Sequence, residues 1–165
     1  MSDLQCAARL LLARDGEAQI DTGSSESGGS LSLTGREQAA ALAESLEDAR
    51  VAVIYCSSRA PAVQTAEIVA ARLGVVVRVR DSLRELSAED ELGAVVDLHR
   101  GESVLVVTDG DAIRRGVPRL ARNLPDSYGN AHEVDQCAVV EVDADADGWV
   151  VRSWGGDPVW SDAAE

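Results

Sequence analysis

The chain has 165 residues, an apolar content of 45% and a formal net charge of −14. This length suits one domain, residues 1–165, with a core of useful size. The strong negative charge argues against nucleic acids and anionic membrane surfaces as partners, because both require a basic face.

Cysteine usage and hydropathy indicate the compartment. Cys6, Cys56 and Cys137 lack the spacing of a zinc site, and the apolar runs around Cys56 and Cys137 predict buried free thiols. No basic and apolar leader is visible, and no apolar run approaches the length of a membrane span. We therefore expect a cytoplasmic protein.

Strand-like segments recur along the chain. Short apolar runs rich in valine and leucine predict six strands: Ala7–Ala13, Val51–Cys56, Val75–Arg80, Ser103–Thr108, Cys137–Val142 and Trp149–Trp154. The third run alternates valine with arginine, which is typical of an edge strand. The last two runs are expected to pair through an acidic turn.

Helical segments lie between these strands. One is predicted from Thr34 to about Leu46, with Thr34 as its N-cap and Glu37 completing a capping box. The others are expected from Pro61 to Leu73, from Ser87 or Ala88 to near Arg100, and from Asp111, itself a candidate cap, to a break near Pro118. Such alternation predicts an α/β three-layer sandwich with a mostly parallel central sheet. Residues 19–33 are predicted to be a mobile loop and 155–165 a tail.

Two aspartates follow the first and fourth predicted strands. One is Asp15, in the triplet Arg-Asp-Gly at 14–16, and the other is Asp109, in Thr-Asp-Gly at 108–110. Open α/β sheets bind ligands at the carboxyl ends of their strands. We therefore predict that both carboxyl groups lie in one binding site.

Five short motifs in this order resemble those of the histidine phosphatase superfamily, also called the phosphoglycerate mutase-like family, from about Arg9 to Trp154. They are Arg14-Asp15-Gly16, Leu33 to Ala39, Tyr55 to Glu67, Leu83-Arg84-Glu85 and Thr108-Asp109-Gly110. The resemblance implies a phosphoglycerate mutase-like fold with a phosphate pocket at the strand ends. Only about seventeen residues separate Glu85 from the strand at Ser103, so we expect a minimal lid.

The departures from the family pattern fall on its chemistry. The resemblance implies histidine at positions 15 and 109, the first phosphorylated and the second holding phosphoryl oxygens, where this chain has aspartate. It also implies a second clamping arginine at the position of Pro61. Arg14 and the proton donor Glu85 remain. The candidate ligand-binding residues are Arg14, Gly16, Arg59, Gly110 and Asp111.

The formal charge of the predicted site indicates which ligands it can bind. One arginine, Arg14, would face the carboxylates of Asp15, Asp109 and Glu85, a formal charge of −2 that repels phosphate. The aspartates could simply neutralise Arg14, or they could work as a carboxylate pair with separated pKa values. A Mg²⁺ or Ca²⁺ site that also uses Asp111 is an alternative, but sequence cannot show convergent geometry, so no metal or cofactor is predicted.

The sequence favours a catalytically inactive member that binds a small molecule or a protein partner at an acidic pocket. The second hypothesis is an enzyme of phosphate-free acid/base chemistry (an isomerase, lyase or cyclase) that uses Asp15, Asp109 and Glu85. A residual phosphatase ranks last. His99 and His132 fall outside the motifs. The identity of the ligand or partner and a homodimer are left open.

Overall fold

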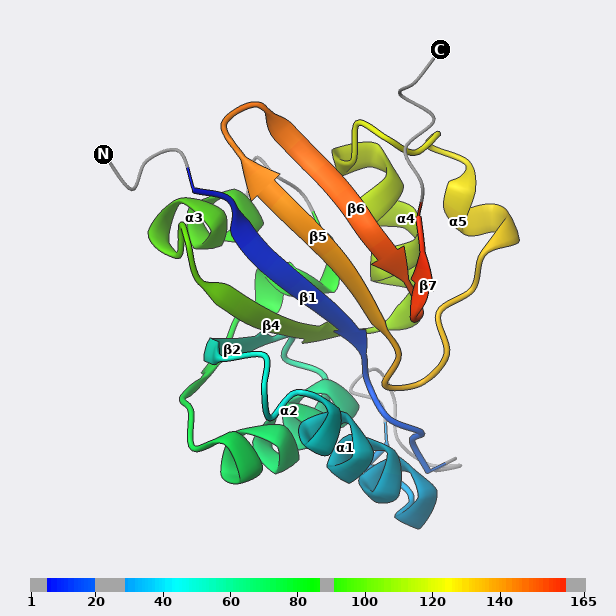
Figure 1. Cartoon of the computed structure of the whole chain (residues 1–165). Helices are drawn as coiled ribbons and strands as arrows, with labels where there is room; N and C mark the ends of the chain where they lie inside the picture. The colour runs from blue at the N-terminus through cyan, green and yellow to red at the C-terminus, as the bar shows by residue number, and fades with distance from the viewer. Residues whose placement is uncertain (1–5, 20–28, 87–90, 160–165) are drawn as a thin grey trace.

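A computed structural model of the chain describes residues 6–19, 29–86 and 91–159. Its centre is a seven-stranded sheet in the order β3-β2-β4-β1-β5-β6-β7 (Figure 1). The strands are β1 (Ala8–Arg14), β2 (Val51–Cys56), β3 (Val77–Val79), β4 (Ser103–Thr108), β5 (Val139–Asp145), β6 (Gly148–Trp154) and β7 (Asp157–Pro158).

The sheet is mixed but mostly parallel. The first four strands run in one direction, β5 is antiparallel to β1, and β6 returns to the direction of β1. β3 lies at one edge, as the valine and arginine alternation predicts. The predicted parallel centre with a terminal antiparallel pair is confirmed.

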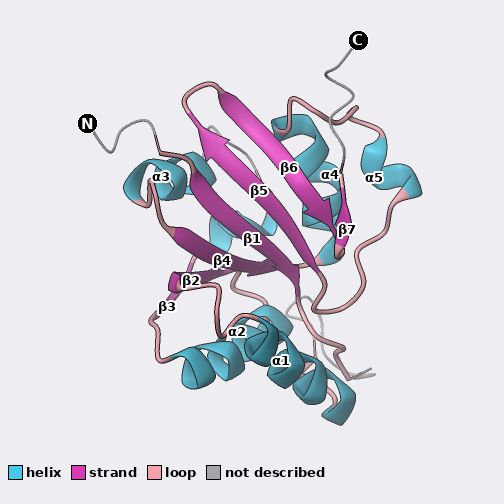
Figure 2. Cartoon of the chain, in the orientation of Figure 1, coloured by secondary structure: helices cyan, strands magenta, loops and turns pink. Residues whose placement is uncertain are grey.

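Helices cover both faces of the sheet (Figure 2). On one face lie α1 (Leu33–Ser45) and α2 (Ala60–Leu73). The other face carries the 3₁₀ helix η2 (Asp81–Arg84), α3 (Glu91–Leu98) and α4 (Gly110–Leu120), with the short α5 (Tyr128–Ala131) packed on α4. The predicted three-layer α/β sandwich is therefore confirmed.

Alternation along the central strands divides the core into two layers. Leu10 and Leu12 pack with the α3 and α4 side, whereas Leu11 and Ala13 pack with the α1 and α2 side. All four are nearly inaccessible to solvent. Because both faces of β1 and β4 are buried, their positions are rigidly held, and so are the residues that follow them.

Two helix caps differ from the sequence prediction. Ser32, not Thr34, caps α1: its hydroxyl accepts the N–H of Gly35 at 3.0 Å and donates to Glu17 at 2.9 Å. Glu17 comes from the segment after β1, so the predicted capping box with Glu37 is replaced by a tertiary contact. Asp109, not Asp111, caps α4.

Other segments also differ from expectation. The predicted tail contains β7, which pairs with β6. Cys137 lies before β5 with φ of 58° and is half-buried, whereas Cys56 is buried as predicted. Most of the predicted mobile loop, residues 20–28, lies outside the described residues, and its flanks pair through an Ala18–Leu31 bridge. The predicted helix start at Ser87 or Ala88 also lies outside them.

No helix within the described part of the chain is both long and apolar enough to cross a membrane.

Candidate functional site

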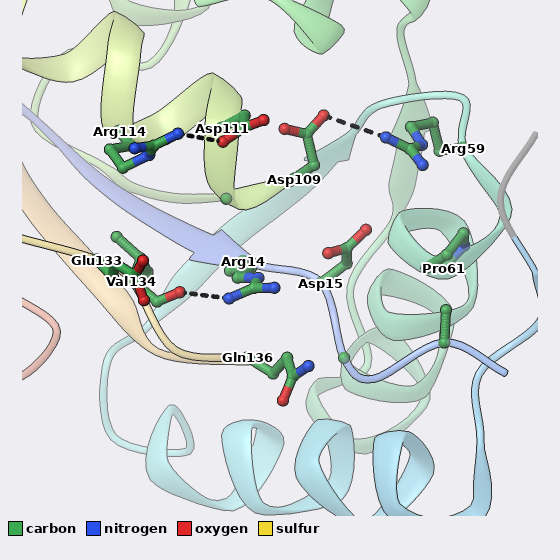
Figure 3. A pocket seen from close by; sticks show the side chains of 13 residues that line it. Arg14, Asp15, Arg59, Pro61, Asp109, Asp111, Arg114, Glu133, Val134 and Gln136 are labelled. Carbon is green, nitrogen blue, oxygen red and sulfur yellow. Dashed lines mark hydrogen bonds and ion pairs between the residues drawn. The ribbon is translucent and has the colours of Figure 1, made fainter. Parts of the chain in front are cut away.

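A cavity of about 470 Å³ opens at the carboxyl ends of β1 and β4 (Figure 3). This is the edge of the sheet where open α/β folds bind ligands. Its lining brings together all the predicted ligand-binding positions and both aspartates: Arg14, Asp15, Gly16, Arg59, Asp109, Gly110 and Asp111. Pro61 also lines it, as do residues that the sequence did not indicate: Ala18, Arg114, Glu133, Val134 and Gln136.

The backbone around Asp15 is fixed by hydrogen bonds on both sides. Asp15 N–H donates to the carbonyl of Thr108 at 2.9 Å, which ties the end of β1 to the end of β4. The next N–H, of Gly16, donates to the Thr65 hydroxyl at 3.0 Å, and that hydroxyl donates to the Pro61 carbonyl at 2.7 Å. The side chain of Asp15 therefore enters the cavity from a held position.

The surroundings of the Asp15 carboxyl group disfavour its ionised form. Burial and, second, the neighbouring Asp109 carboxylate together raise its pKa from the ordinary 3.8 to about 6. Arg59, Arg14 and its own backbone N–H act in the opposite direction but do not cancel the rise. Figure 3 shows Asp15 between these groups. Near neutral pH, Asp15 therefore takes up a proton far more readily than an ordinary aspartate.

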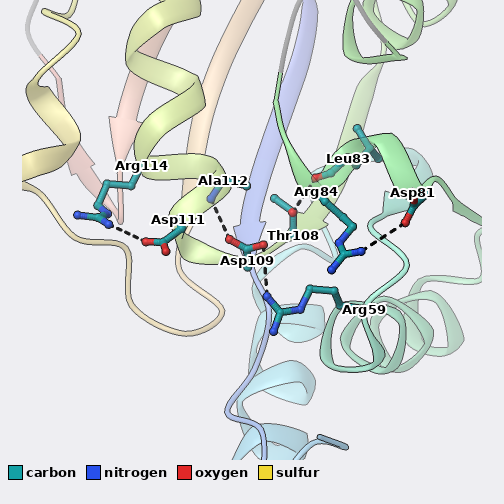
Figure 4. A network of polar contacts seen from close by, with 9 residues as sticks. All are labelled: Arg59, Asp81, Leu83, Arg84, Thr108, Asp109, Asp111, Ala112 and Arg114. Atoms are coloured by element: carbon teal, nitrogen blue, oxygen red, sulfur yellow. Dashed lines mark hydrogen bonds and ion pairs between the residues drawn. The ribbon is translucent and has the colours of Figure 1, made fainter. Parts of the chain in front are cut away.

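Asp109 is held from two directions (Figure 4). Its Oδ1 accepts the N–H of Ala112 at 2.8 Å, so the carboxylate caps α4 and lies at the positive end of the helix dipole. Its Oδ2 lies 3.7 Å from Nη1 of Arg59, the residue directly before α2. One carboxylate thus caps the helix N-terminus and faces the nearby arginine at ion-pair distance.

Arg14 lies across the floor of the cavity. Its Nη1 donates to the Val134 carbonyl at 2.8 Å. A Cβ added to Gly110 would lie 3.0 Å from Arg14 Cδ, so glycine at this position leaves room for the arginine side chain. Val134 lies in the segment that connects α5 to β5. No local sequence pattern predicts that this segment reaches the cavity.

The rim carries another ion pair. Arg114 donates to Asp111 at 2.6 Å, three residues earlier on α4, and this hydrogen bond lowers the pKa of the exposed Asp111. The i,i+3 spacing from Asp111 could have indicated Arg114. Glu133 and Gln136 could not have been found from local patterns.

Glu85 does not line the cavity. It is exposed, following η2, which a hydrogen bond from the Thr108 hydroxyl to the Leu83 carbonyl holds against β4. The charge expected for the site therefore changes. Three arginines and four carboxylates line the cavity, a formal charge of −1 in place of the −2 predicted from sequence.

The remaining reactive side chains are not among the residues that line the cavity. His99 shares a 2.9 Å hydrogen bond with the Tyr55 hydroxyl, and the ring of His132 stacks on Tyr128. Burial, with Asp15 nearby, raises the pKa of the Cys137 thiol to about 12, so this thiol stays protonated. Among the described residues, no group of three histidine, cysteine or acidic side chains converges to hold a metal ion.

Comparison with known proteins assigns the family. Residues 10–94 and 88–157 match the model of the histidine phosphatase superfamily (branch 1). The chain belongs to this superfamily. A comparison with curated proteins finds no match.

Solved structures of the superfamily share the fold. Bacillus stearothermophilus YhfR is 22% identical with a TM-score of 0.75, covering 93% of this chain and 98% of that one. A mycobacterial glucosyl-3-phosphoglycerate phosphatase is 20% identical with a TM-score of 0.71, covering 90% and 99%. Phosphoserine phosphatase from Entamoeba histolytica is 14% identical with a TM-score of 0.71, covering 89% and 96%. At these identities the likeness concerns the fold.

Asp15→Asn is predicted to stabilise the protein at neutral pH. The folded-state pKa of about 6 exceeds the ordinary 3.8, so ionising Asp15 destabilises the fold as pH rises through this window. Asparagine removes that ionisation. The variant should match the wild type near pH 3, below the ordinary pKa of 3.8, and exceed its unfolding free energy by about 1–3 kcal/mol above pH 7, measured by urea denaturation.

The control is Asp111→Asn, on the same rim. Its pKa is lowered rather than raised, so its loss should not stabilise the protein at any pH above 4. If the unfolding free energies of Asp15→Asn and the wild type had the same pH dependence, the pKa of Asp15 would not be raised in the folded protein.

Proposed function

We propose that this protein is a catalytically inactive histidine phosphatase-like protein that binds a small ligand or a protein partner at the altered cavity. The observation that carries the proposal is the position of Asp109. Its carboxylate accepts a hydrogen bond from the N–H of Ala112 at the start of α4 and faces Arg59. Helix N-termini and arginines are the groups that bind phosphate, and here a carboxylate of the protein already caps the helix N-terminus and faces the arginine.

The second aspartate supports the same proposal. Asp15 lies in the cavity beside Asp109, and a phosphate dianion placed there would meet two carboxylates at close range. Like charges in a partly desolvated site repel by several kcal/mol. Pro61 adds no positive charge where the family pattern has an arginine. Phosphohistidine chemistry also needs a histidine, and the cavity lining contains none.

A second candidate function is phosphate-free acid/base catalysis. It is favoured by the pKa of about 6 for Asp15, because general bases work best when their pKa lies near the working pH. Asp15 would accept or donate the proton, with burial and Asp109 keeping its pKa high. Glu85, outside the cavity, takes no part in this version. A bound ligand recovered chemically changed by wild type but intact from Asp15→Asn would favour this candidate.

The purified protein is predicted to release no phosphate from an aryl phosphate or from phosphoglycerates, with or without Mg²⁺. The reason is the absence of a phosphorylatable histidine in the cavity and the occupied anion-binding groups. Phosphate release is followed by a colorimetric assay. Turnover by wild type that disappears in Asp15→Ala would contradict the proposal.

Asp109→Asn is predicted to create anion affinity. Asparagine retains the capping acceptor but removes the charge that faces Arg59, so vanadate should bind at least about tenfold more tightly at neutral pH. Calorimetric titration with vanadate measures this. Asp111→Asn, whose carboxylate pairs with Arg114 at the rim, is the matched control and should change affinity much less. Tight vanadate binding by the wild type would overturn the role given to Asp109.

A further inference from the structure

Two groups of opposite charge in the cavity have no hydrogen-bond partner among the described residues. They are the carboxylate of Asp15 and the guanidinium of Arg59. The Asp15 carboxylate has no hydrogen bond to another described residue; its own backbone N–H, which donates to Thr108, is the only hydrogen-bonding group that acts on it. Arg59 lies 3.7 Å from Asp109, an ion-pair distance beyond the usual range of a hydrogen bond, and its Nε is buried without a partner.

Most other charged groups of the cavity are engaged. Arg14 donates to a carbonyl, Asp109 accepts a backbone N–H, and Asp111 and Arg114 bind each other. The carboxylate of Glu133 is exposed at the rim. The partly buried groups of the cavity that lack a hydrogen bond to another described residue are therefore one acceptor, the Asp15 carboxylate, and one donor, the Arg59 guanidinium.

Unsatisfied charged groups favour a ligand that supplies what they lack. Removing a carboxylate and a guanidinium from water without partners costs free energy. The raised pKa of Asp15 reflects that cost on the acidic side. A ligand that donates to Asp15 and accepts from Arg59 would replace the lost hydration of both. A lone anion would instead face Asp15 and Asp109, and a lone cation would face Arg14 and Arg59.

We infer that the cavity binds a small amino-carboxylate zwitterion, with its ammonium group at Asp15 and its carboxylate at Arg59. This inference rests on the proposed function, because it requires a site that is not a phosphate centre. A zwitterion has no net charge, which suits a lining with three arginines and four carboxylates. The volume of about 470 Å³ also lies within the range of small-molecule sites, about 300–1,000 Å³.

The sign of proton exchange distinguishes this ligand from an anion. An ammonium group at Asp15 favours the ionised carboxylate, so binding near pH 6 releases protons. An anion at the same place favours the protonated form and takes protons up. The charged and titratable groups facing Asp15 are Arg14 from β1, Arg59 before α2, Asp109 at α4 and Cys137 before β5.

The experiment is calorimetric titration near pH 6 in two buffers of different ionisation enthalpy. The probes are glycine and β-alanine, with ethylamine and acetate as half-probes that carry one charged group each. We expect the better zwitterion to bind at least about tenfold more tightly than either half-probe, and to release protons.

Variants locate the two ends of the ligand. Asp15→Asn should abolish proton release and weaken zwitterion binding by about tenfold, and Arg59→Gln should weaken binding equally while proton release persists. Asp48→Asn and Arg50→Gln, both exposed and directly before β2, at the opposite end of the parallel strands from the cavity, are the charge-matched controls and should leave binding unchanged.

Different failures have different meanings. Ethylamine binding as tightly as the zwitterions would overturn this inference and leave the proposed function intact. So would the absence of binding by every probe up to roughly 50 mM, an affinity too weak for a dedicated site. Tight acetate or vanadate binding with proton uptake by the wild type would overturn both.

Discussion

The cavity of this protein is organised by the carboxylate of Asp109, which caps α4 and faces Arg59. A helix N-terminus and an arginine at the carboxyl end of a parallel sheet form a site for anions, because backbone N–H groups and the guanidinium all point toward the same place. Here the anion belongs to the protein. This carboxylate is also, after burial, the second cause of the raised pKa of Asp15.

The protonation state of Asp15 depends on burial first and on the Asp109 carboxylate second. Asp15 is partly buried, lies beside a second carboxylate, and shares Arg59 with that carboxylate. The backbone leaves it little freedom to move away, because the strand ends and Thr65 hold the residues on either side. The outcome is a carboxyl group whose pKa of about 6 is set by burial and by Asp109. Such a group can select ligands by charge, or it can exchange protons.

The fold was largely predictable because its signals are local. Apolar runs mark β1 and β4, and the residues directly after them, Asp15 and Asp109, had to meet at one edge of a parallel sheet. The order of the motifs along the chain also indicated the superfamily. Caps were less predictable: Ser32 was chosen over Thr34 because Glu17, distant in sequence, reaches its hydroxyl.

The rest of the site depends on long-range packing. Glu133, Val134 and Gln136 reach the cavity because β5 pairs antiparallel with β1, which no local pattern in 128–138 indicates. Glu85 is excluded from the lining because the hydrogen bond from Thr108 to Leu83 fixes η2 with that side chain in solvent. Arg59 enters the lining because it stands directly before α2, two positions from Pro61, with its side chain turned toward Asp109.

The central claim is that protein carboxylates hold the place of a phosphate. Carbon-detected NMR titration of the Asp15 carboxyl group, with and without millimolar inorganic phosphate, tests it most directly. The account predicts a midpoint near 6 that phosphate does not move. A midpoint near the ordinary 3.8, or an upward shift when phosphate is added, would contradict it.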